Sequence, residues 1–293
     1  IVNYKADKEL KRCLGSIKKF AKGISFEVIV IDNSKDNKWY SGGNNQALVR
    51  ARGKYVLFLN PDCYLTENVL AELVGWMDKH PKAGVSEPRQ VYDNGRIAPT
   101  GSLLPVWWVD VVELTELSRW FGSVGRLGWF EEILKKKAAP VVRSPLPWFS
   151  STRRGVTTTG FGRTGEFFQG KNTGPSEKYR QVGKDRRENW RTEVVSGAAM
   201  MVRKRVLDKI GGFDERLKLY YTDVDLCRRI LEAGFEIWHV GEFQIGHSTR
   251  KSTSKLKWDE LYDIYAGDAR SYYRKWGNGI GGAILFLAMK INK

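Results

Sequence analysis

Cysteine is scarce in this sequence of 293 residues, and its three cysteines show no paired spacing. Cys13 and Cys227 fall in helical patterns, and Cys63 stands alone. Disulfide frameworks and structural zinc sites both depend on cysteines in recurring spacings. We therefore expect reduced thiols in a reducing compartment, with neither a disulfide framework nor a zinc site.

Long apolar runs are also missing. The last apolar run, from Ile280 to Met289, is much shorter than the roughly 20 residues that a membrane-spanning helix needs, although it could lie on a bilayer. At the other end, Ile1-Val2-Asn3-Tyr4 has the pattern of the end of a strand. We therefore expect this strand to begin upstream of Ile1.

Acidic residues are in deficit: 33 Asp and Glu face 49 Lys and Arg, which gives a formal charge of +16. Between Lys135 and Arg205 there are 17 basic and 5 acidic residues, and five tryptophans lie just before, within residues 107–148. Tryptophan beside basic residues is typical of contact with an anionic membrane surface. Nucleic acid is the rival partner, but no helix-turn-helix, zinc-finger or ribonucleoprotein motif is present. We expect a membrane partner and no nucleic acid, with a solvated basic loop as the alternative.

Strands and helices alternate over the first ninety residues, and this predicts an α/β fold with a doubly wound, mostly parallel sheet flanked by helices. The expected strands are 26–31, 55–59 and 83–87; the expected helices are 7–20 with Asp7 as N-cap, a short helix after a glycine-marked loop at 41–45, and 66–79; a hairpin turn is expected at 93–95.

Regular patterns stop near residue 103 and return near residue 193. The later expected elements are a strand at 194–202, a helix at 204–210 that stops at Gly211-Gly212, a helix at 222–233, a strand at 235–240 and a long helix at 256–275. The chain is thus divided into 1–102, an aromatic and basic insertion at 103–192, a second half of the same domain at 193–250, and a C-terminal helical segment at 251–293.

A carboxylate at position 62 is the most informative single feature. The continuous apolar run Tyr55–Leu59 is typical of a buried parallel strand, and Pro61 ends it, which delivers Asp62 at the carboxyl end of the strand. Ligands bind at that edge of open α/β sheets. A carboxylate there suits a divalent cation that in turn holds a diphosphate. The alternative is that Asp62 caps the helix beginning near Thr66.

A second acidic cluster occurs at the start of the 222–233 helix. Thr222 and Asp225 match a capping box, in which the hydroxyl and the carboxylate three residues later satisfy the first turn. Asp223 has no capping role in that scheme. It is therefore our candidate general base for a substrate hydroxyl.

His247 follows the 235–240 strand, between Gly246 and Ser248, in a stretch expected to be loop. A lone histidine is usually structural, but this one could supply a neutral imidazole to the cation held by Asp62. His80 and His239 are expected to be structural.

Seven short motifs occur in the order and spacing of one known family. The chain resembles the inverting, nucleotide-sugar-dependent glycosyltransferases of the GT-A fold, in particular the family that includes the rhamnosyltransferases of polysaccharide assembly. The motifs cover roughly 1–100 and 193–250; they are Ile1-Val2-Asn3-Tyr4, Val30-Ile31-Asp32-Asn33-Ser34, Ser41-Gly42-Gly43-Asn44-Asn45, Leu59-Asn60-Pro61-Asp62, Ser196-Gly197-Ala198-Ala199, Gly211-Gly212-Phe213-Asp214-Glu215 and Asp223-Val224-Asp225-Leu226.

The resemblance implies a role for each matching position. Asp32 would contact the nucleotide base, Asp62 would bind Mg²⁺ or Mn²⁺ on the sugar diphosphate, and Asp223 would be the catalytic base. The implied donor-binding set is Asn3, Asp32, Asn33, Asn45, Asn60 and Asp62, the metal ligands are Asp62 and His247, and the supporting or acceptor-side set is Thr222, Asp225 and Gly197. Two residues depart from the family pattern: Asn60 replaces the first acid of Asp-x-Asp, and Thr222 replaces a Glu.

These implications predict a metal-dependent transfer of a sugar from a nucleotide diphosphate to a lipid-linked or polysaccharide acceptor. Such an enzyme would act in cell-envelope polysaccharide synthesis, as a peripheral protein on the cytoplasmic face of the cell membrane. Two other classes stay open. A nucleotidyltransferase would need a glycine-rich phosphate loop at the first strand, which Asn3–Asp7 lacks. A catalytically inactive glycan- or membrane-binding protein would fit if the departures at Asn60 and Thr222 abolish catalysis.

Overall fold

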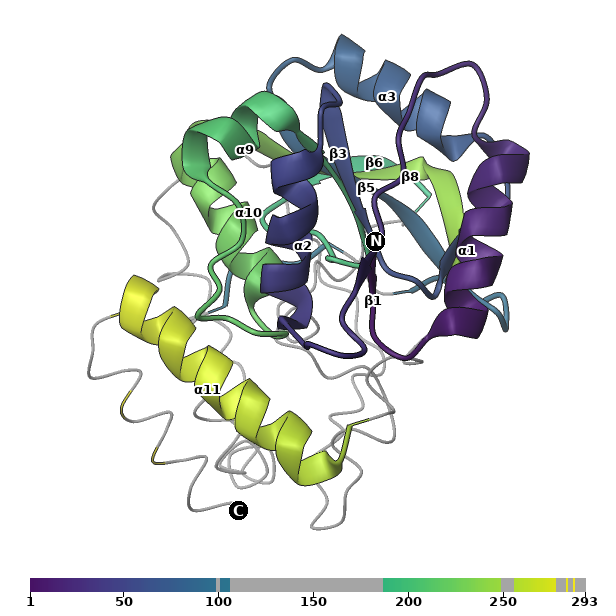
Figure 1. The fold of residues 1–293 in the computed structure, drawn as a ribbon. Helices are drawn as coiled ribbons and strands as arrows, with labels where there is room; N and C mark the ends of the chain where they lie inside the picture. Colours follow the sequence, from purple (N-terminus) through teal and green to yellow (C-terminus); the bar gives the residue numbers. More distant parts are fainter. Residues whose placement is uncertain (99–100, 106–186, 249–255, 278–282, 284–286, 288–293) are drawn as a thin grey trace, which may run out of the picture.

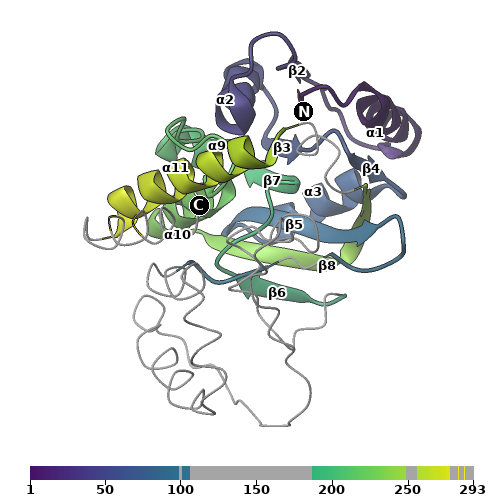
Figure 2. The ribbon, with the colours of Figure 1, turned by 90° about the horizontal axis from the view of Figure 1, so that it is seen from below.

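The computed structural model of the protein describes residues 1–98, 101–105, 187–248 and 256–277, with residues 283 and 287. Within these ranges, a central sheet lies between helices on both faces (Figure 1, Figure 2), which confirms the predicted α/β class. None of the helices in the described ranges has both the length and the apolar character needed to cross a membrane. Residues 107–150, and all but two residues of the 280–289 run, lie outside the described part of the chain.

The described strands form two sheets. They are β1 (Val2–Asn3), β2 (Ile31–Asp32), β3 (Tyr55–Leu59), β4 (Cys63–Leu65), β5 (Ala83–Tyr92), β6 (Asn189–Thr192), β7 (Ala199–Arg203) and β8 (Glu236–His247). β1 and β2 form a parallel pair, and the larger sheet has the order β3-β7-β5-β8-β4, with β6 also paired to β8. β6 belongs to the stretch predicted as an insertion, yet it joins the central sheet.

The sheet is more mixed in direction than the sequence predicted. β5 and β8 are parallel, whereas β7 is antiparallel to both β3 and β5, and β4 and β6 are antiparallel to β8. Alternating strands and helices predict direction only where a helical crossover links two strands of one sheet. β4 follows β3 and β7 follows β6, in both cases without an intervening helix, so no helical crossover sets the direction of β4 or β7. β3 pairs with β7 in the antiparallel direction, so the prediction that β3 is a parallel strand is wrong.

Six helices in the described ranges cover the sheet. They are α1 (Asp7–Phe20), α2 (Trp39–Arg50), α3 (Val69–Lys79), α9 (Lys204–Ile210), α10 (Thr222–Glu232) and α11 (Trp258–Trp276). Side chains alternate between the two faces of a strand. On β7, Met200 and Val202 belong to the core formed with α9, α10 and α11, while Ala199 packs with α1 and Met201 with α3.

The glycine-marked motif at 41–45 is helical, not a loop. It lies inside α2, and Gly42 and Gly43 are buried. A Cβ atom on Gly43 would lie 2.7 Å from the Val2 Cγ1 atom of β1. The glycines therefore serve close packing of the helix against β1, and the prediction of a loop, which took them as a turn signal, is wrong.

Several boundaries also differ from the predicted ones. Asp7 is the first residue of α1 instead of its cap, and its carboxylate accepts a hydrogen bond from Asn3 Nδ2 at 2.8 Å. Of the predicted strand 26–31, only Ile31 is paired, and the observed strand β2 consists of Ile31 and Asp32. The hairpin turn is confirmed: Gly95 has a φ of 77°, and the flanking backbone closes from Tyr92 N to Arg96 O at 2.8 Å.

The capping box predicted for α10 is not formed. Tyr221 precedes the helix with a φ of 58°, and the Thr222 hydroxyl donates to Leu219 O at 3.4 Å. Asp225 is fully buried, and its carboxylate accepts bonds from Arg229 Nε at 2.9 Å, Lys275 Nζ at 2.7 Å and Trp276 Nε1 at 2.7 Å. Asp225 therefore joins α10 to α11 instead of capping α10.

This role predicts a larger stability loss than a cap would give. Asp225→Asn removes the charge that Arg229 and Lys275 face, and removing one member of a buried ion pair costs about 3–5 kcal/mol. Because the two cations are 15% and 22% exposed, we expect about 3 kcal/mol, measured by urea unfolding. The matched control is Asp208→Asn, which removes a surface pair with Lys204 and should cost below about 1 kcal/mol. Equal losses for the two variants would contradict this assignment.

Candidate active site

The end of β3 and the end of β8 meet at Asp62. β4 begins directly after Asp62 and pairs with β8 so that Cys63 lies opposite His247. This register brings His247 Nε2 to 3.6 Å from Asp62 Oδ1. His247 is the last residue of β8, so the prediction that it lies in a loop is wrong. The strand continues past Gly241 because β8 is paired on both sides, to β5 and to β4.

These residues form a cluster with the donor types of a cation site. The ligand atoms of Asp62, Cys63 and His247 all lie within 4.8 Å of one another. Burial, and next the neighbouring Asp62, hold the pKa of the Cys63 thiol well above its usual range. The thiol therefore stays neutral, and a carboxylate and an imidazole are the groups offered to a cation. No pattern in the sequence pointed to Cys63 as a member of this cluster.

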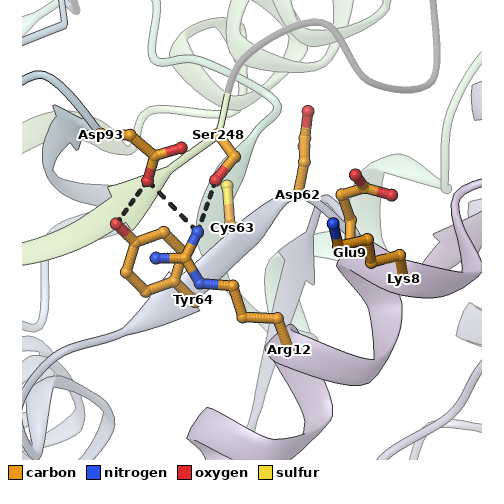
Figure 3. Close-up of a pocket in the computed structure, with 8 residues that line it drawn as sticks. All are labelled: Lys8, Glu9, Arg12, Asp62, Cys63, Tyr64, Asp93 and Ser248. Carbon is orange, nitrogen blue, oxygen red and sulfur yellow. Dashed lines mark hydrogen bonds and ion pairs between the residues drawn. The ribbon is translucent and has the colours of Figure 1, made fainter.

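A cavity of about 220 Å³ opens beside Asp62, between α1 and the β4–β8 edge (Figure 3). Arg12 crosses it, with its guanidinium 3.4 Å from the centroid of the Tyr64 ring and 2.8 Å from Ser248 Oγ. Asp93 accepts bonds from Arg12 at 3.2 Å and from Tyr64 Oη at 2.8 Å. The cavity wall is thus fixed by contacts between four separate segments of the chain.

Asn3 and Asp32 lie side by side, because β1 and β2 pair in parallel with Asn3 opposite Asp32. The Asp32 carboxylate is exposed and accepts the Ser34 N–H at 2.9 Å; bonds from Ser34 lower its pKa, so it is ionised at neutral pH. Asn33 is buried and donates to Trp39 O at 2.8 Å. Exposed and charged, Asp32 is the member of this group that is free to meet a ligand.

Asn45 has a different environment from the rest of the predicted donor set. Its Nδ2 donates to Phe213 O at 2.9 Å and Glu215 Oε1 at 2.8 Å, and its Oδ1 accepts the Phe213 N–H at 2.8 Å. The amide is therefore committed to holding the 213–215 segment against α2. Asn60 lies at the end of β3, where its N–H donates to Ala198 O at 2.8 Å.

Asp223 is the second residue of α10 and is partly buried. Its carboxylate accepts the Gly197 N–H at 3.1 Å and the Val224 N–H at 2.9 Å. Burial raises the pKa of Asp223 above its ordinary value, although these hydrogen bonds act in the opposite direction. A carboxyl group with a raised pKa is a better proton acceptor than an exposed one.

The segment Ser196–Ala198 connects the two acidic positions. Ala198 O accepts the N–H of Asn60, two residues before Asp62, and the N–H of the preceding Gly197 binds Asp223. A Cβ atom at Gly197 would lie 2.8 Å from the Tyr40 hydroxyl, which donates to Gly197 O at 2.7 Å. Gly197 is thus required for close packing between α2 and the start of α10.

Asp268 on α11 holds the backbone segment that precedes α10. Its two carboxylate oxygens accept the backbone N–H groups of Lys218, Leu219 and Tyr220 at 2.8–2.9 Å. These residues lead into Tyr221 and Asp223. No local sequence signal distinguished Asp268, because its partners are backbone groups about fifty residues earlier.

Comparisons with known proteins give a family match over part of the chain and a likeness in fold. Residues 33–108 match the model of the family described as glycosyl transferase family 2. A stretch of 61 residues is 36% identical to N-acetylglucosaminyl-diphospho-decaprenol L-rhamnosyltransferase of Mycobacterium tuberculosis, over 21% of this chain and 20% of that protein. The match thus spans about one fifth of the length of these curated relatives.

Two solved structures give the extent of the fold likeness. The structure of GalNAc-T7 with UDP, GalNAc and Mn²⁺ is similar over 99% of this chain and 53% of that chain, with a TM-score of 0.50 and 13% identity. That of S. aureus TarS 1-349 in complex with UDP-GlcNAc covers 98% and 70%, with a TM-score of 0.48 and 15% identity. The chain therefore matches the glycosyl transferase family 2 model over residues 33–108, and its mixed α/β fold is similar to that of GalNAc-T7.

Proposed function

We propose that the protein is a metal-dependent, inverting glycosyltransferase that moves a sugar from a nucleotide-diphosphate donor to a hydroxyl of a glycan or lipid-linked acceptor. The observation that carries the proposal is the pair of acidic positions linked by Gly197 and Ala198: Asp62 beside His247, and Asp223 at the start of α10. The M. tuberculosis relative, whose name describes a lipid-linked acceptor, supports the acceptor class.

The groups around Asp62 fit a divalent cation. Its carboxylate is 6% exposed, and within the described ranges its ion-pair partner is His247. Nδ1 of the same histidine is buried and has no partner in the described part of the chain. Asp62 and His247 would hold Mg²⁺ or Mn²⁺; the fold neighbour GalNAc-T7 contains Mn²⁺ with UDP. When bound, the cation supplies charge neutralisation for a diphosphate leaving group.

Asp223 would act on the acceptor. Its carboxylate takes the proton of the acceptor hydroxyl while the hydroxyl oxygen forms a bond to the anomeric carbon of the donor sugar. The bond from that carbon to the diphosphate breaks, and the nucleotide diphosphate leaves with the electron pair. Because attack and departure occur on opposite faces, the anomeric configuration inverts. One base suffices, unlike the paired carboxylates of glycoside hydrolysis.

Asp32 would contact the nucleotide, since it is the exposed, ionised group at the carboxyl ends of β1 and β2. Asn3 and Asn33 would support it by holding the turns into α1 and α2, where they bind Ala6 N–H at 3.2 Å and Trp39 O at 2.8 Å. Asn45 is assigned to positioning, because its amide is occupied by Phe213 and Glu215.

A panel of UDP-, GDP- and dTDP-linked sugars tests the proposal. Nucleotide release is measured for each donor with Mn²⁺, with Mg²⁺ and with EDTA, in the presence and absence of polyprenyl-diphosphate glycan acceptors. We expect one donor class to be turned over with cation and not with EDTA, and an inverted linkage in the product. Binding of every donor without turnover would favour a catalytically inactive glycan-binding protein. Release of diphosphate from a nucleoside triphosphate and a sugar phosphate would favour a nucleotidyltransferase.

We propose that this enzyme works as a peripheral protein on the anionic inner face of the cell membrane. The support is the charge of +12 between Lys135 and Arg205 and the five tryptophans of 107–148. The tryptophans and residues 135–186 of the basic segment lie outside the described residues. Each basic residue near an anionic surface contributes about 1 kcal/mol, and salt weakens this term but not tryptophan burial. We expect sedimentation with phosphatidylglycerol vesicles that high salt reduces without abolishing. Deletion of 107–150 should remove the salt-resistant fraction, and an intact protein that ignores these vesicles at low salt would contradict the proposal.

A further inference from the structure

A carboxylate and an imidazole lie buried together in the central sheet. Glu87 on β5 and His239 on β8 stand opposite each other in the parallel pairing, and both side chains have 0% exposure. His239 Nδ1 lies 3.3 Å from Glu87 Oε1, and the Trp190 ring covers the histidine with its centroid 3.9 Å away. Burying a carboxylate costs free energy unless hydrogen bonds satisfy it. An apolar pair at these two positions would stabilise the sheet at least as well, so the presence of Glu87 and His239 needs an explanation other than stability.

The second carboxylate oxygen of Glu87 binds the backbone segment that also contacts Asp223. Glu87 Oε2 accepts the Ser196 N–H at 2.8 Å. The next N–H along the chain, that of Gly197, donates to Asp223 Oδ2 at 3.1 Å. Two consecutive backbone N–H groups thus bind two different carboxylates. The orientation of the peptide between them depends on Glu87 as well as on the Tyr40 hydroxyl at Gly197 O.

We propose that Glu87, held in place by His239, is a positioning residue for Asp223: it fixes the Ser196–Gly197 peptide whose N–H orients the Asp223 carboxylate. The inference rests on the proposed function, in which Asp223 is the base. Both residues lie in strands whose apolar neighbours are fixed in the core, so the carboxylate is presented from a rigid support. A displacement of about 1 Å in a reacting group can cost up to roughly 100-fold in rate.

Glu87 also acts on Asp223 through its charge. The titratable groups that face Asp223 are Tyr40 from α2, Glu87 from β5 and Cys227 one turn further along α10. Burial raises the pKa of the Tyr40 hydroxyl and of the Cys227 thiol, which keeps both neutral. Glu87 is the carboxylate of the three. Burial is the largest cause of the raised pKa of Asp223, and the charge of Glu87 raises this pKa further.

The test compares two substitutions on β5. Glu87→Gln retains an oxygen for Ser196 N–H but removes the charge, and Gln90→Met alters a buried polar side chain three residues along the same strand as a control. The assay is nucleotide release from the sugar donor with the highest turnover in the donor panel, with acceptor present. For Glu87→Gln we expect kcat to fall about 10- to 100-fold, unchanged KM for the donor, and an acid limb of the pH–rate profile moved to lower pH. Gln90→Met should leave all three unchanged.

The outcomes separate this inference from the proposed function. Wild-type kcat and an unmoved acid limb for Glu87→Gln would overturn the positioning role, whatever Asp223→Asn does. Equal losses for Glu87→Gln and Gln90→Met would also overturn it, because they would indicate a general weakening of the sheet. Glu87→Asp provides a rescue test: it restores the charge, so the acid limb should return towards the wild-type position. If Asp223→Asn itself retains transfer, the failure lies in the base assignment of the proposed function.

Discussion

Asp223→Asn is expected to retain donor binding and lose sugar transfer. The substitution keeps the shape of the side chain and an oxygen for the Gly197 N–H, but the amide cannot accept a proton from the acceptor hydroxyl. Loss of a general base typically costs 10²- to 10⁴-fold in rate, and we expect a loss of about 10³-fold in kcat. Donor affinity, measured by calorimetry with UDP or dTDP and Mn²⁺, should stay within about twofold, because the carboxylate faces Gly197 and α10.

The pH dependence provides an independent check. Burial raises the pKa of Asp223, so wild-type activity should fall as the pH is lowered through a value above the ordinary aspartate pKa of about 3.9. A raised pKa also means that the folded protein holds the proton of Asp223 more tightly than the unfolded chain does. The stability that the protonated carboxyl contributes is therefore lost as the pH rises from acid to neutral. Asp223→Asn should therefore unfold at the same temperature as the wild type, or higher, at pH 7. Substantial transfer by this variant would contradict the base assignment.

Local patterns in the sequence were sufficient for most helices and for the α/β class. The helical spacing of Cys13 and Ile17, for example, predicts the face of α1 that packs on the sheet. Local patterns failed where a residue serves a distant partner. Gly43 was interpreted as a turn signal, but it makes room for Val2, and Asp225 was interpreted as a cap, but it binds Lys275. In each case the partner lies so far along the chain that a local sequence pattern cannot predict the contact.

The candidate site shows the same division. The sequence singled out Asp62, Asp223 and His247 individually, since each follows a strand or begins a helix. Their relation depends on the β4–β8 register, which sets Cys63 opposite His247 across 184 residues of chain. Glu87 and His239 were not singled out for the site, because a glutamate in a strand and a lone histidine are usually structural. Only the pairing of β5 with β8 brings them together.

Asp62→Asn should abolish the dependence on a divalent cation together with most of the turnover. The amide lacks the negative charge that a cation requires, and His247 alone is a weak site for Mg²⁺. Losing one strong electrostatic contact to developing charge typically costs about 10²- to 10³-fold in rate. His247→Gln should have a smaller effect of about tenfold, since the carboxylate remains. Mn²⁺ binding is measured by calorimetry, and turnover is measured across a Mn²⁺ titration.

A matched control lies in the same cavity. Glu9 lines the cavity beside Asp62 but is not part of the Asp62–Cys63–His247 cluster, so Glu9→Gln removes an equal charge without removing a ligand. Glu9→Gln should keep Mn²⁺ affinity and turnover within about threefold, because loss of an outlying charge near a solvent-open surface is strongly screened. If Asp62→Asn instead turns over donor at the wild-type rate with saturating Mn²⁺, the cation is held elsewhere. Asp62 would then be a structural carboxylate, stabilised by its contact with His247.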